Sequence, residues 1–145
     1  MMQPNFEVMD DLTISDDKSK LDAGLIHRFL TTSYWAKGRT IEEVKKSIEY
    51  SICFGVYKHD KQIGFARIVT DCTVIAYLMD VFILEEHRGK GFSKLLLKTI
   101  FEDDRLKSVK KWILATKDAH SLYAGFGFEK IKNPDRLMEK VVPRK

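Results

Sequence analysis

Proline is scarce in this chain and is confined to its two ends. Of the 145 residues only three are proline, at positions 4, 134 and 143, so proline interrupts no helix or strand in the long middle of the chain. Glycine is also sparse, with eight residues, and there is no Gly/Pro-rich linker, internal repeat or low-complexity segment. Because a chain of this length usually forms one domain, we expect a single domain over residues 1–145.

Cysteine is rarer still. The two cysteines, Cys53 and Cys72, lie in apolar, strand-like runs and form no Cys-x-x-Cys pair or Cys/His cluster, which argues against a disulfide framework or a metal site. We expect both thiols to be buried and unpaired, as in a reducing compartment. No apolar run approaches the roughly 20 residues that span a bilayer, and the N-terminus has no apolar signal-peptide core. The sequence therefore predicts a cytoplasmic protein with no membrane segment and no metal.

No charge sign dominates the composition. The chain has 25 Lys+Arg and 21 Asp+Glu, a net charge of +4, and 44% hydrophobic residues, which is typical of a globular protein and not of a disordered one. A small positive excess is compatible with an anionic ligand, but it does not by itself indicate nucleic-acid binding. Since no helix-turn-helix or RNA-binding aromatic pattern is present, we do not expect a nucleic-acid partner.

The hydrophobic pattern changes its period along the chain. Apolar residues at helical spacing predict helices over 20–31, 41–50, 94–101 and 119–126. Thr40 and Glu43 form a predicted capping box at the second of these, and Asp118 is the predicted cap of the last. β-Branched and aromatic runs predict an opening strand within 6–14 and further strands over 52–58, 62–71, 73–84, 112–116, 128–131 and 137–141. The order indicates an α/β (α+β) fold, a mixed sheet with helices packed on it.

A basic turn with two glycines joins the strand over 73–84 to the helix over 94–101. Gly89 and Gly91 let the backbone approach a ligand closely, and the first N–H groups of the following helix, with the helix dipole, favour an anion. Arg88 and Lys90 add positive charge, so the turn predicts a phosphate or pyrophosphate site. It has neither Walker nor dinucleotide-fingerprint spacing. The alternative is an ordinary strand-to-helix turn whose basic residues are solvated.

Two motifs resemble the GNAT superfamily of N-acetyltransferases. Arg88-x-x-Gly91-x-Ser93 resembles the [Q/R]-x-x-G-x-[G/A] pyrophosphate loop of that superfamily, and residues 119–128, AHSLYAGFGF, are similar to its A-x-x-L-Y-x-x-x-G-F segment. The element order is similar too, so the resemblance covers essentially the whole chain. It implies a mixed, mostly antiparallel sheet of about six or seven strands with about four helices packed on it. Two positions depart from the family pattern. Ser93 stands where the family usually has Gly or Ala, and Thr116 stands where it often has Asn.

The resemblance implies acetyl-CoA as the acetyl donor and an amine as the acceptor, either a small molecule or an exposed protein amino group. Tyr123 would act as the general acid for the departing CoA thiolate. Backbone groups at the end of the strand over 73–84 would bind the pantetheine arm, and one of its N–H groups would polarise the thioester carbonyl. The residues that the resemblance assigns to the donor are Phe82, Ile83, Leu84, Arg88, Gly89, Lys90, Gly91, Phe92 and Ser93.

Three further residues are candidates on the acceptor side. Asp80 is a carboxylate in an otherwise apolar strand, where a charge needs a partner or a use. It either pairs with a basic residue such as Arg67, or it binds or deprotonates the acceptor ammonium, directly or through water. Tyr34 and Trp35 are large aromatic residues in a predicted loop, and either plug the core or line the acceptor pocket.

The main alternative is a non-catalytic protein of the same fold, an acyl-CoA sensor or interaction module. Tyr123 favours the enzyme, because a non-catalytic relative could lose this tyrosine without penalty. His87 and His120 flank the two motifs, and their default interpretation is as solvated side chains. The identity of the acceptor amine and the oligomeric state, with a homodimer as one option, stay open at this point.

Overall fold

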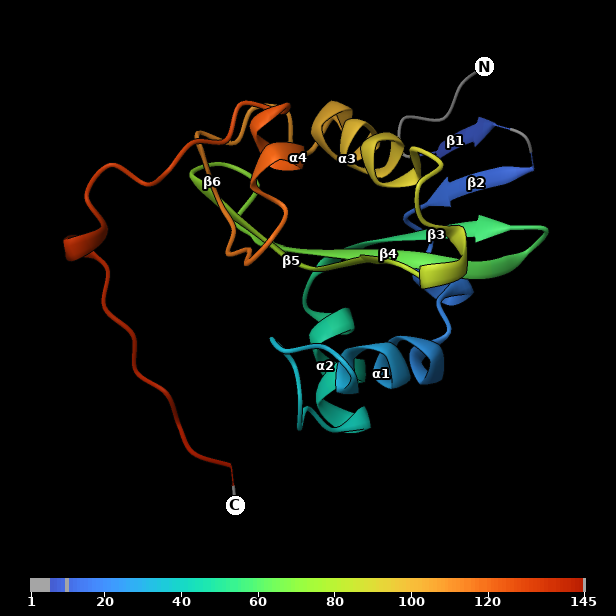
Figure 1. Ribbon diagram of the computed structural model, residues 1–145, viewed down its shortest axis with the longest axis horizontal. Coiled ribbons are helices and arrows are strands. Elements are labelled where there is room, and N and C mark those ends of the chain that lie inside the picture. Colours follow the sequence, from blue (N-terminus) through green and yellow to red (C-terminus); the bar gives the residue numbers. More distant parts are fainter. Residues whose placement is uncertain (1–5, 10, 145) are drawn as a thin grey trace. The chain divides into compact units, whose positions relative to one another are not determined.

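Six strands form one sheet in the order in which they occur in the chain. The computed structural model describes residues 6–9 and 11–144, and the chain divides into two compact units, residues 1–115 and 116–145. All six strands belong to the first unit (Figure 1). They are β1 (Phe6–Met9), β2 (Leu12–Ser15), β3 (Ile52–Lys58), β4 (Lys61–Thr70), β5 (Ile75–Ile83) and β6 (Lys111–Ile113).

Every neighbouring pair of strands is antiparallel except β5 and β6, which are parallel. This confirms the predicted mixed, mostly antiparallel sheet. Strand β6 pairs only with Ile75–Tyr77, the first part of β5, so the pairing does not extend to the later residues of β5. The end of β5, where the predicted donor residues lie, is therefore paired with β4 alone among the described strands.

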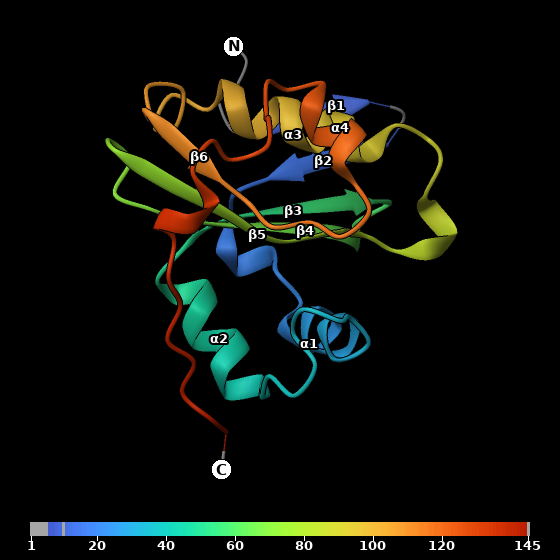
Figure 2. The same cartoon turned by 60° about the vertical axis from the view of Figure 1, so that its left-hand side comes forward.

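Helices cover both faces of the sheet in the first unit. Helices α1 and α2 lie on one face and α3 lies on the other, as two views show (Figures 1 and 2). The α-helices are α1 (Ala23–Thr31), α2 (Ile41–Glu49), α3 (Phe92–Glu102) and, in the second unit, α4 (His120–Ala124). Short 3-10 turns are η1 (Lys18–Lys20), η2 (Glu85–His87) and η3 (Pro134–Arg136). The four α-helices agree with the predicted number.

The core between the sheet and the first two helices follows from their amphipathic spacing. Ile26 and Leu30 of α1 and Val44 and Ile48 of α2 are four or fewer residues apart within each helix, so each pair shares a face. These side chains pack with buried residues of the sheet. The sheet residues of this cluster are Cys53, Phe65 and Phe82.

Several local expectations were wrong. The opening segment is two paired strands, β1 and β2, instead of one, because a turn with Asp11 at a φ of 66° reverses the chain. Cys53 is buried as expected, but Cys72 is only half-buried, in the turn after β4. Asp118 does not cap α4: Ala119 is the N-cap residue, and no side chain caps this helix. The Oγ1 of Thr116 accepts a hydrogen bond from the Ala119 N–H at 3.0 Å.

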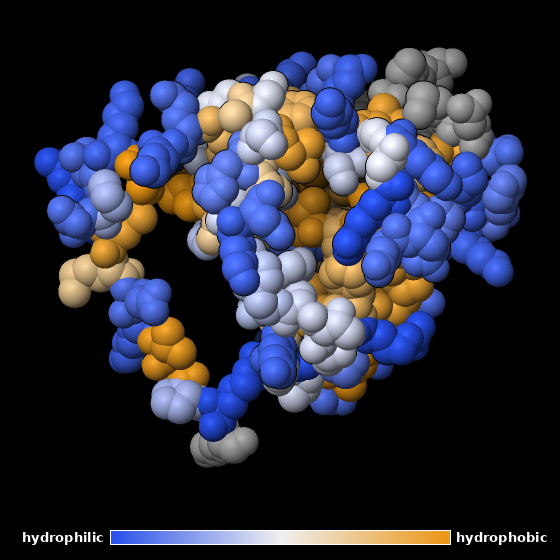
Figure 3. Space-filling model, viewed as in Figure 1, coloured by the Kyte–Doolittle hydropathy of each residue, from blue (hydrophilic) through white to orange (hydrophobic). Residues whose placement is uncertain are grey.

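The two C-terminal strands predicted over 128–131 and 137–141 are absent from the described structure. A strand needs a partner for its backbone hydrogen bonds, and an apolar pattern alone does not supply one. Pro134 instead begins η3. Apolar and hydrophilic residues alternate along this segment in the space-filling view (Figure 3), with Leu137, Met138, Val141 and Val142 55–96% exposed.

The start of α2 depends on the predicted capping box. The Thr40 side chain accepts from the Glu43 N–H at 3.1 Å, and the Glu43 carboxylate accepts from the Thr40 N–H at 2.8 Å. We predict that Thr40→Ala lowers the free energy of unfolding by about 1 kcal/mol, because the Glu43 N–H loses the hydroxyl oxygen that accepts its hydrogen bond. Thr40→Ser, which keeps the hydroxyl, is the control. Urea denaturation measures both, and equal midpoints for the two variants would contradict the assignment.

Candidate active site

Strand β5 carries an irregularity at Asp80. In the pairing with β4, Phe65 lies opposite Phe82 but Arg67 lies opposite Met79, so one residue of β4 faces two residues of β5. Asp80 adopts a φ of 56°, in the left-handed region, which non-glycine residues seldom occupy. Such a bulge kinks a strand and redirects its side chains. The bulge therefore separates the first part of β5, which pairs with β6, from the last part.

The Asp80 carboxylate lies at the centre of a buried hydrogen-bond cluster. Its side chain is 1% exposed and accepts from Trp35 Nε1 at 2.9 Å, from Arg39 Nη1 at 2.7 Å and from Arg67 Nε at 2.9 Å. Arg67 also donates to the Ser51 hydroxyl at 3.1 Å. The predicted pairing of Asp80 with Arg67 is confirmed, and two positive charges compensate the buried negative one.

This cluster fixes the segment between α1 and α2. Trp35 and Arg39 both come from that segment, and the Arg39 carbonyl also lies 3.0 Å from His27 Nε2 of α1. The Trp35 ring meets Tyr34 edge to face at 5.3 Å between centroids. Tyr34 and Trp35 remain 58% and 40% exposed. The segment thus presents two aromatic surfaces to solvent while the side chains of Trp35 and Arg39 tie it to β5.

The turn before α3 has the local features of an anion cradle. Gly89 and Gly91 have φ values of 78° and 82°, and a Cβ at either position would meet nothing within 4 Å. Gly91 is the N-cap of α3 and no side chain caps that helix end. The first N–H groups of α3 have no partner within the helix, so a bound anion can accept hydrogen bonds from them.

The other residues of this turn have distinct positions. Arg88, exposed overall, donates from Nε to the carbonyl of Ile83 at 2.9 Å, which ties the turn to the end of β5. Lys90 is exposed, and Ser93 is half-buried in the first turn of α3. Phe92 is buried, with the Lys58 ammonium 5.6 Å from its ring centroid, so its side chain anchors α3 and is not presented to a ligand.

The three predicted strand residues differ in what their backbone can offer. The Leu84 N–H donates to the Ile63 carbonyl at 2.7 Å and is therefore used within the sheet. Antiparallel pairs alternate between residues that bond to the partner strand and residues that point away from it. Since Ile83 lies opposite Gly64, next to that bonded pair, its N–H and carbonyl point away from β4. Phe82 is buried and stacks on Phe29 at 4.0 Å.

Tyr123 lies in α4 of the second unit. Its side chain is 8% exposed and its ring packs edge to face on Phe128, with 5.9 Å between centroids. Its carbonyl accepts from the Phe126 and Phe128 N–H groups at 2.9 and 3.2 Å, which closes the helix into the Gly127 turn, at a φ of 92°. The A-x-x-L-Y-x-x-x-G-F segment therefore forms a short helix and a tight turn that hold this tyrosine.

The sequence analysis did not predict that Trp35 and Arg39 bind Asp80. Two sequence features indicate such a contact: a lone carboxylate in an apolar strand requires a compensating partner, and the loop over 32–39 contains a tryptophan and basic residues that can donate to it. In the part of the chain that the structure describes, no group of three or more His, Cys, Asp or Glu side chains could hold a metal ion. No described helix is long and apolar enough to cross a membrane.

Comparison with known proteins identifies the class. The acetyltransferase (GNAT) domain model matches residues 49–130, more than half of the chain, and the chain therefore belongs to the GNAT acetyltransferase family. A crystal structure of a provisionally assigned GNAT acetyltransferase from Xanthomonas campestris is similar, with 43% identity and a TM-score of 0.89. That match covers 94% of this chain and 96% of the other.

Two curated relatives are more distant. A protein of Gibberella zeae, provisionally named an acetyltransferase, is 28% identical over 112 residues, which are 63% of this chain and 63% of its own length. An uncharacterized N-acetyltransferase of Prochlorococcus marinus is 30% identical over 99 residues, 65% of this chain and 54% of its own length. The chain thus matches less than two thirds of the length of these two relatives. The names of these three similar proteins do not state which acceptor each one acetylates.

The Asp80 cluster generates a prediction about stability. Asp80→Asn removes the negative charge and leaves Arg39 and Arg67 facing a neutral amide in a buried site. Breaking a buried ion pair by removing one partner typically costs about 3–5 kcal/mol, and we expect a loss of this size in chemical denaturation. Asp118→Asn, at an exposed position, is the control, with a change within about 0.5 kcal/mol. Unfolding midpoints that coincide for both variants would show that the cluster contributes nothing to stability.

Proposed function

We propose that the protein transfers the acetyl group of acetyl-CoA to an amine by direct attack of the amine on the thioester. The observation that carries the proposal is the turn over residues 88–93, an uncapped helix start with two open glycines at the end of β5, in a chain of the GNAT acetyltransferase family. Members of this family generally use acetyl-CoA. The acceptor is either a small-molecule amine or an exposed protein amino group.

The residues of the turn fit a pyrophosphate group. Gly89 and Gly91 leave room for close approach, the first amides of α3 are directed out of the helix, and Arg88 and Lys90 bring positive charge. Ile83 is the strand residue whose backbone we assign to the pantetheine arm and the thioester carbonyl, because its polar groups point away from β4. When bound, acetyl-CoA supplies the activated acetyl group.

We assign Tyr123 as the general acid that protonates the departing thiolate. The support is its place in the A-x-x-L-Y-x-x-x-G-F segment, which resembles that of the family. A phenol with an ordinary pKa near 10 keeps its proton at neutral pH and can give it to a developing thiolate.

Asp80 belongs to the acceptor side in this proposal. Three hydrogen bonds from Trp35, Arg39 and Arg67 occupy its carboxylate, which supports a positioning role. Through them Asp80 holds Tyr34 and Trp35, our candidates for the acceptor wall, in one arrangement. Proton removal from the acceptor ammonium by Asp80, directly or through water, is the further role that the sequence predicted and that remains a prediction.

We also propose a single functional domain and keep the predicted location and oligomeric state. The family model crosses the boundary between the two compact units, which supports one functional domain over residues 1–145. A cytoplasmic location and a homodimer remain predictions. A non-catalytic acyl-CoA sensor is the alternative function, and it predicts acetyl-CoA binding without turnover.

A binding experiment tests the donor site. At a hundred times its dissociation constant, acetyl-CoA should stabilise the protein by about 2.7 kcal/mol, measured as a shift of the unfolding transition. Lys90→Glu should weaken acetyl-CoA but leave S-acetylpantetheine unaffected, since only acetyl-CoA carries the pyrophosphate. Lys45→Glu, with the same charge change at an exposed position of α2, is the control. An equal loss with both variants would assign the effect to net charge and remove the turn as the site.

A kinetic experiment tests Tyr123. Tyr123→Phe removes only the phenol hydroxyl, so acetyl-CoA should still bind while single-turnover acetyl transfer falls by about 10²–10⁴-fold. Tyr50→Phe, at a 74% exposed tyrosine, is the matched control and should transfer at the wild-type rate. Amine panels with detection of the released thiol supply the acceptor. Unchanged single-turnover rates across the pH range would eliminate Tyr123 as the acid.

A further inference from the structure

The later residues of β5 have a strand on one side only. Strand β4 pairs with β5 as far as Gly64 and Ile83, whereas β6 pairs only with Ile75–Tyr77. Among the described strands, none therefore pairs with Ile83 on the side away from β4. Backbone N–H and carbonyl groups on such an open side need partners from side chains, water or a ligand.

The Arg88 side chain supplies one such partner, because its Nε donates to the Ile83 carbonyl at 2.9 Å. The N–H of the same peptide group belongs to Leu84 and donates to the Ile63 carbonyl of β4 at 2.7 Å. In a trans peptide the N–H and the carbonyl point in opposite directions, so the Ile83 carbonyl points away from β4. The peptide group between Ile83 and Leu84 is thus bonded on both sides, to β4 and to Arg88.

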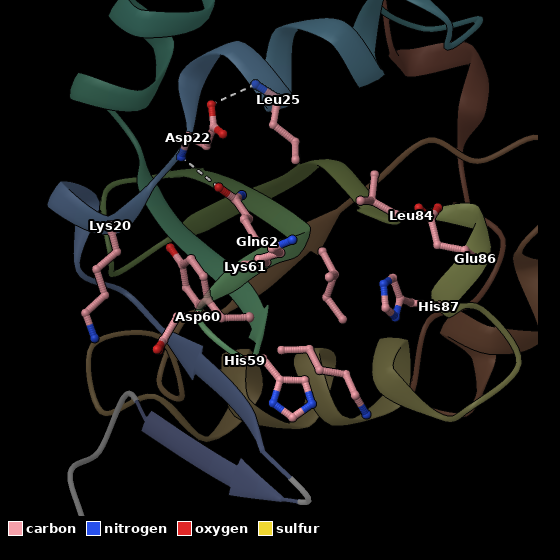
Figure 4. Close-up of a pocket in the computed structure, with 13 residues that line it drawn as sticks. Lys20, Asp22, Leu25, His59, Asp60, Lys61, Gln62, Leu84, Glu86 and His87 are labelled. Carbon is pink, nitrogen blue, oxygen red and sulfur yellow. Dashed lines mark hydrogen bonds between the residues drawn. The ribbon is translucent and has the colours of Figure 1, made fainter.

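Packing contributes little to holding η2, the turn that leads to Arg88. None of the residues of η2 is buried, and no side chain caps it. Leu84, Glu86 and His87 line an open cleft of about 740 Å³ beside the β3–β4 hairpin (Figure 4), so the hairpin does not fill the space next to η2. The Arg88 N–H donates to the Glu85 carbonyl at 3.2 Å, and the Arg88 Nε bond ties the turn to the end of β5.

The bond from Arg88 distinguishes the two backbone groups of Ile83. In an extended strand the N–H and the carbonyl of one residue point to the same side, so the Ile83 N–H also points away from β4. The carbonyl already accepts from Arg88, which leaves the N–H as the group to offer to a ligand. Because Arg88 and β4 hold the peptide group that follows Ile83, they restrict the backbone rotation that would turn this N–H aside. A donor held in one direction is what polarisation of a thioester carbonyl requires.

We propose that Arg88 is a positioning residue for the thioester: by bonding to the Ile83 carbonyl it holds the Ile83 N–H toward the acetyl group of acetyl-CoA. This inference rests on the proposed function and goes beyond the positive charge that Arg88 brings to the pyrophosphate there. The alternative is that Arg88 acts through its charge alone. The two roles need different atoms, because positioning requires a hydrogen-bond donor at the place of Nε, whereas neutralisation of the pyrophosphate requires the charge.

Two substitutions of similar size separate the donor from the charge. The side-chain amide nitrogen of glutamine is as many bonds from Cα as Nε of arginine, so Arg88→Gln keeps a donor at that place and loses the charge. Arg88→Met has a methyl group at the same place and loses both the donor and the charge. Since the two variants have the same net charge, any difference between them is due to the hydrogen bond to Ile83. Arg88 is exposed, so both variants should fold.

Infrared spectroscopy measures the effect on the thioester without any acceptor. The probe is acetyl-CoA labelled with ¹³C at the thioester carbonyl, bound to the full chain at saturation, with calorimetry setting the saturating concentration for each variant. A hydrogen bond to this carbonyl lowers its stretching frequency. The frequency should therefore fall when the labelled acetyl-CoA binds to the wild type and to Arg88→Gln, and stay close to that of free acetyl-CoA with Arg88→Met. A role in folding alone would not move this frequency at saturation.

Hydrogen exchange measured by NMR tests the bond in the free protein. Without acetyl-CoA, the Leu84 N–H should exchange roughly tenfold faster in Arg88→Met than in the wild type or Arg88→Gln, the effect of one hydrogen bond on local opening. Equal exchange in the two variants, or equal carbonyl frequencies with bound acetyl-CoA, would overturn the positioning role and leave the proposed function intact. A wild type that does not bind acetyl-CoA would overturn the proposed function and this inference with it.

Discussion

The buried carboxylate of Asp80 connects three parts of the first unit that are far apart in the sequence. It accepts hydrogen bonds from Trp35 and Arg39 of the segment between α1 and α2 and from Arg67 of β4. A carboxylate this deep in a sheet is tolerated only because two guanidinium groups and an indole N–H surround it. Its φ of 56° also marks the bulge of β5. One residue thus sets both the shape of the strand and the position of the aromatic segment.

The consequences of the bulge extend to the end of β5. Beyond it, Phe82 packs under Phe29, and the polar backbone groups of Ile83 point away from β4. The Arg88 side chain bonds to the Ile83 carbonyl, so the strand end and the glycine turn form one connected unit. The aromatic segment is attached to β5 at Asp80, before the end of the strand, and the glycine turn follows that end. Along β5 and the turn, the proposed acceptor side, thioester site and pyrophosphate site therefore follow one another in this order. We regard this order as the physical basis of the proposed function.

Sequence patterns predicted most of the fold, because apolar periodicity reports directly on burial. The capping box at Thr40 and Glu43 and the strands β3 and β4 follow from local residue types alone. The two C-terminal failures have different causes. Residues 137–141 have strand-like composition but no described partner strand, which depends on groups distant in sequence. At α4 the adjacent Asp118 does not act as the cap, because Ala119 is the N-cap residue and no side chain caps the helix.

In the candidate site, too, the local motif was predictable from the sequence and the long-range contacts were not. The turn at Arg88–Ser93 is a local motif and was found from its spacing. That Asp80 binds Trp35 and Arg39 depends on a fold that brings residues more than 40 positions apart together, and no local pattern encodes it. Likewise, nothing in the sequence distinguishes Ile83 from Phe82 and Leu84 as the residue whose backbone points away from β4, because this depends on register with Gly64.

A crystal structure of the protein with acetyl-CoA bound would test the central claim most directly. The account predicts that the pyrophosphate oxygens accept hydrogen bonds from backbone amides within residues 89–93 and that the Ile83 backbone contacts the pantetheine arm or the thioester. It also predicts that Asp80 keeps its bonds to Trp35, Arg39 and Arg67. Acetyl-CoA bound at a different surface, or bound with the Ile83 backbone paired to another strand, would contradict the account.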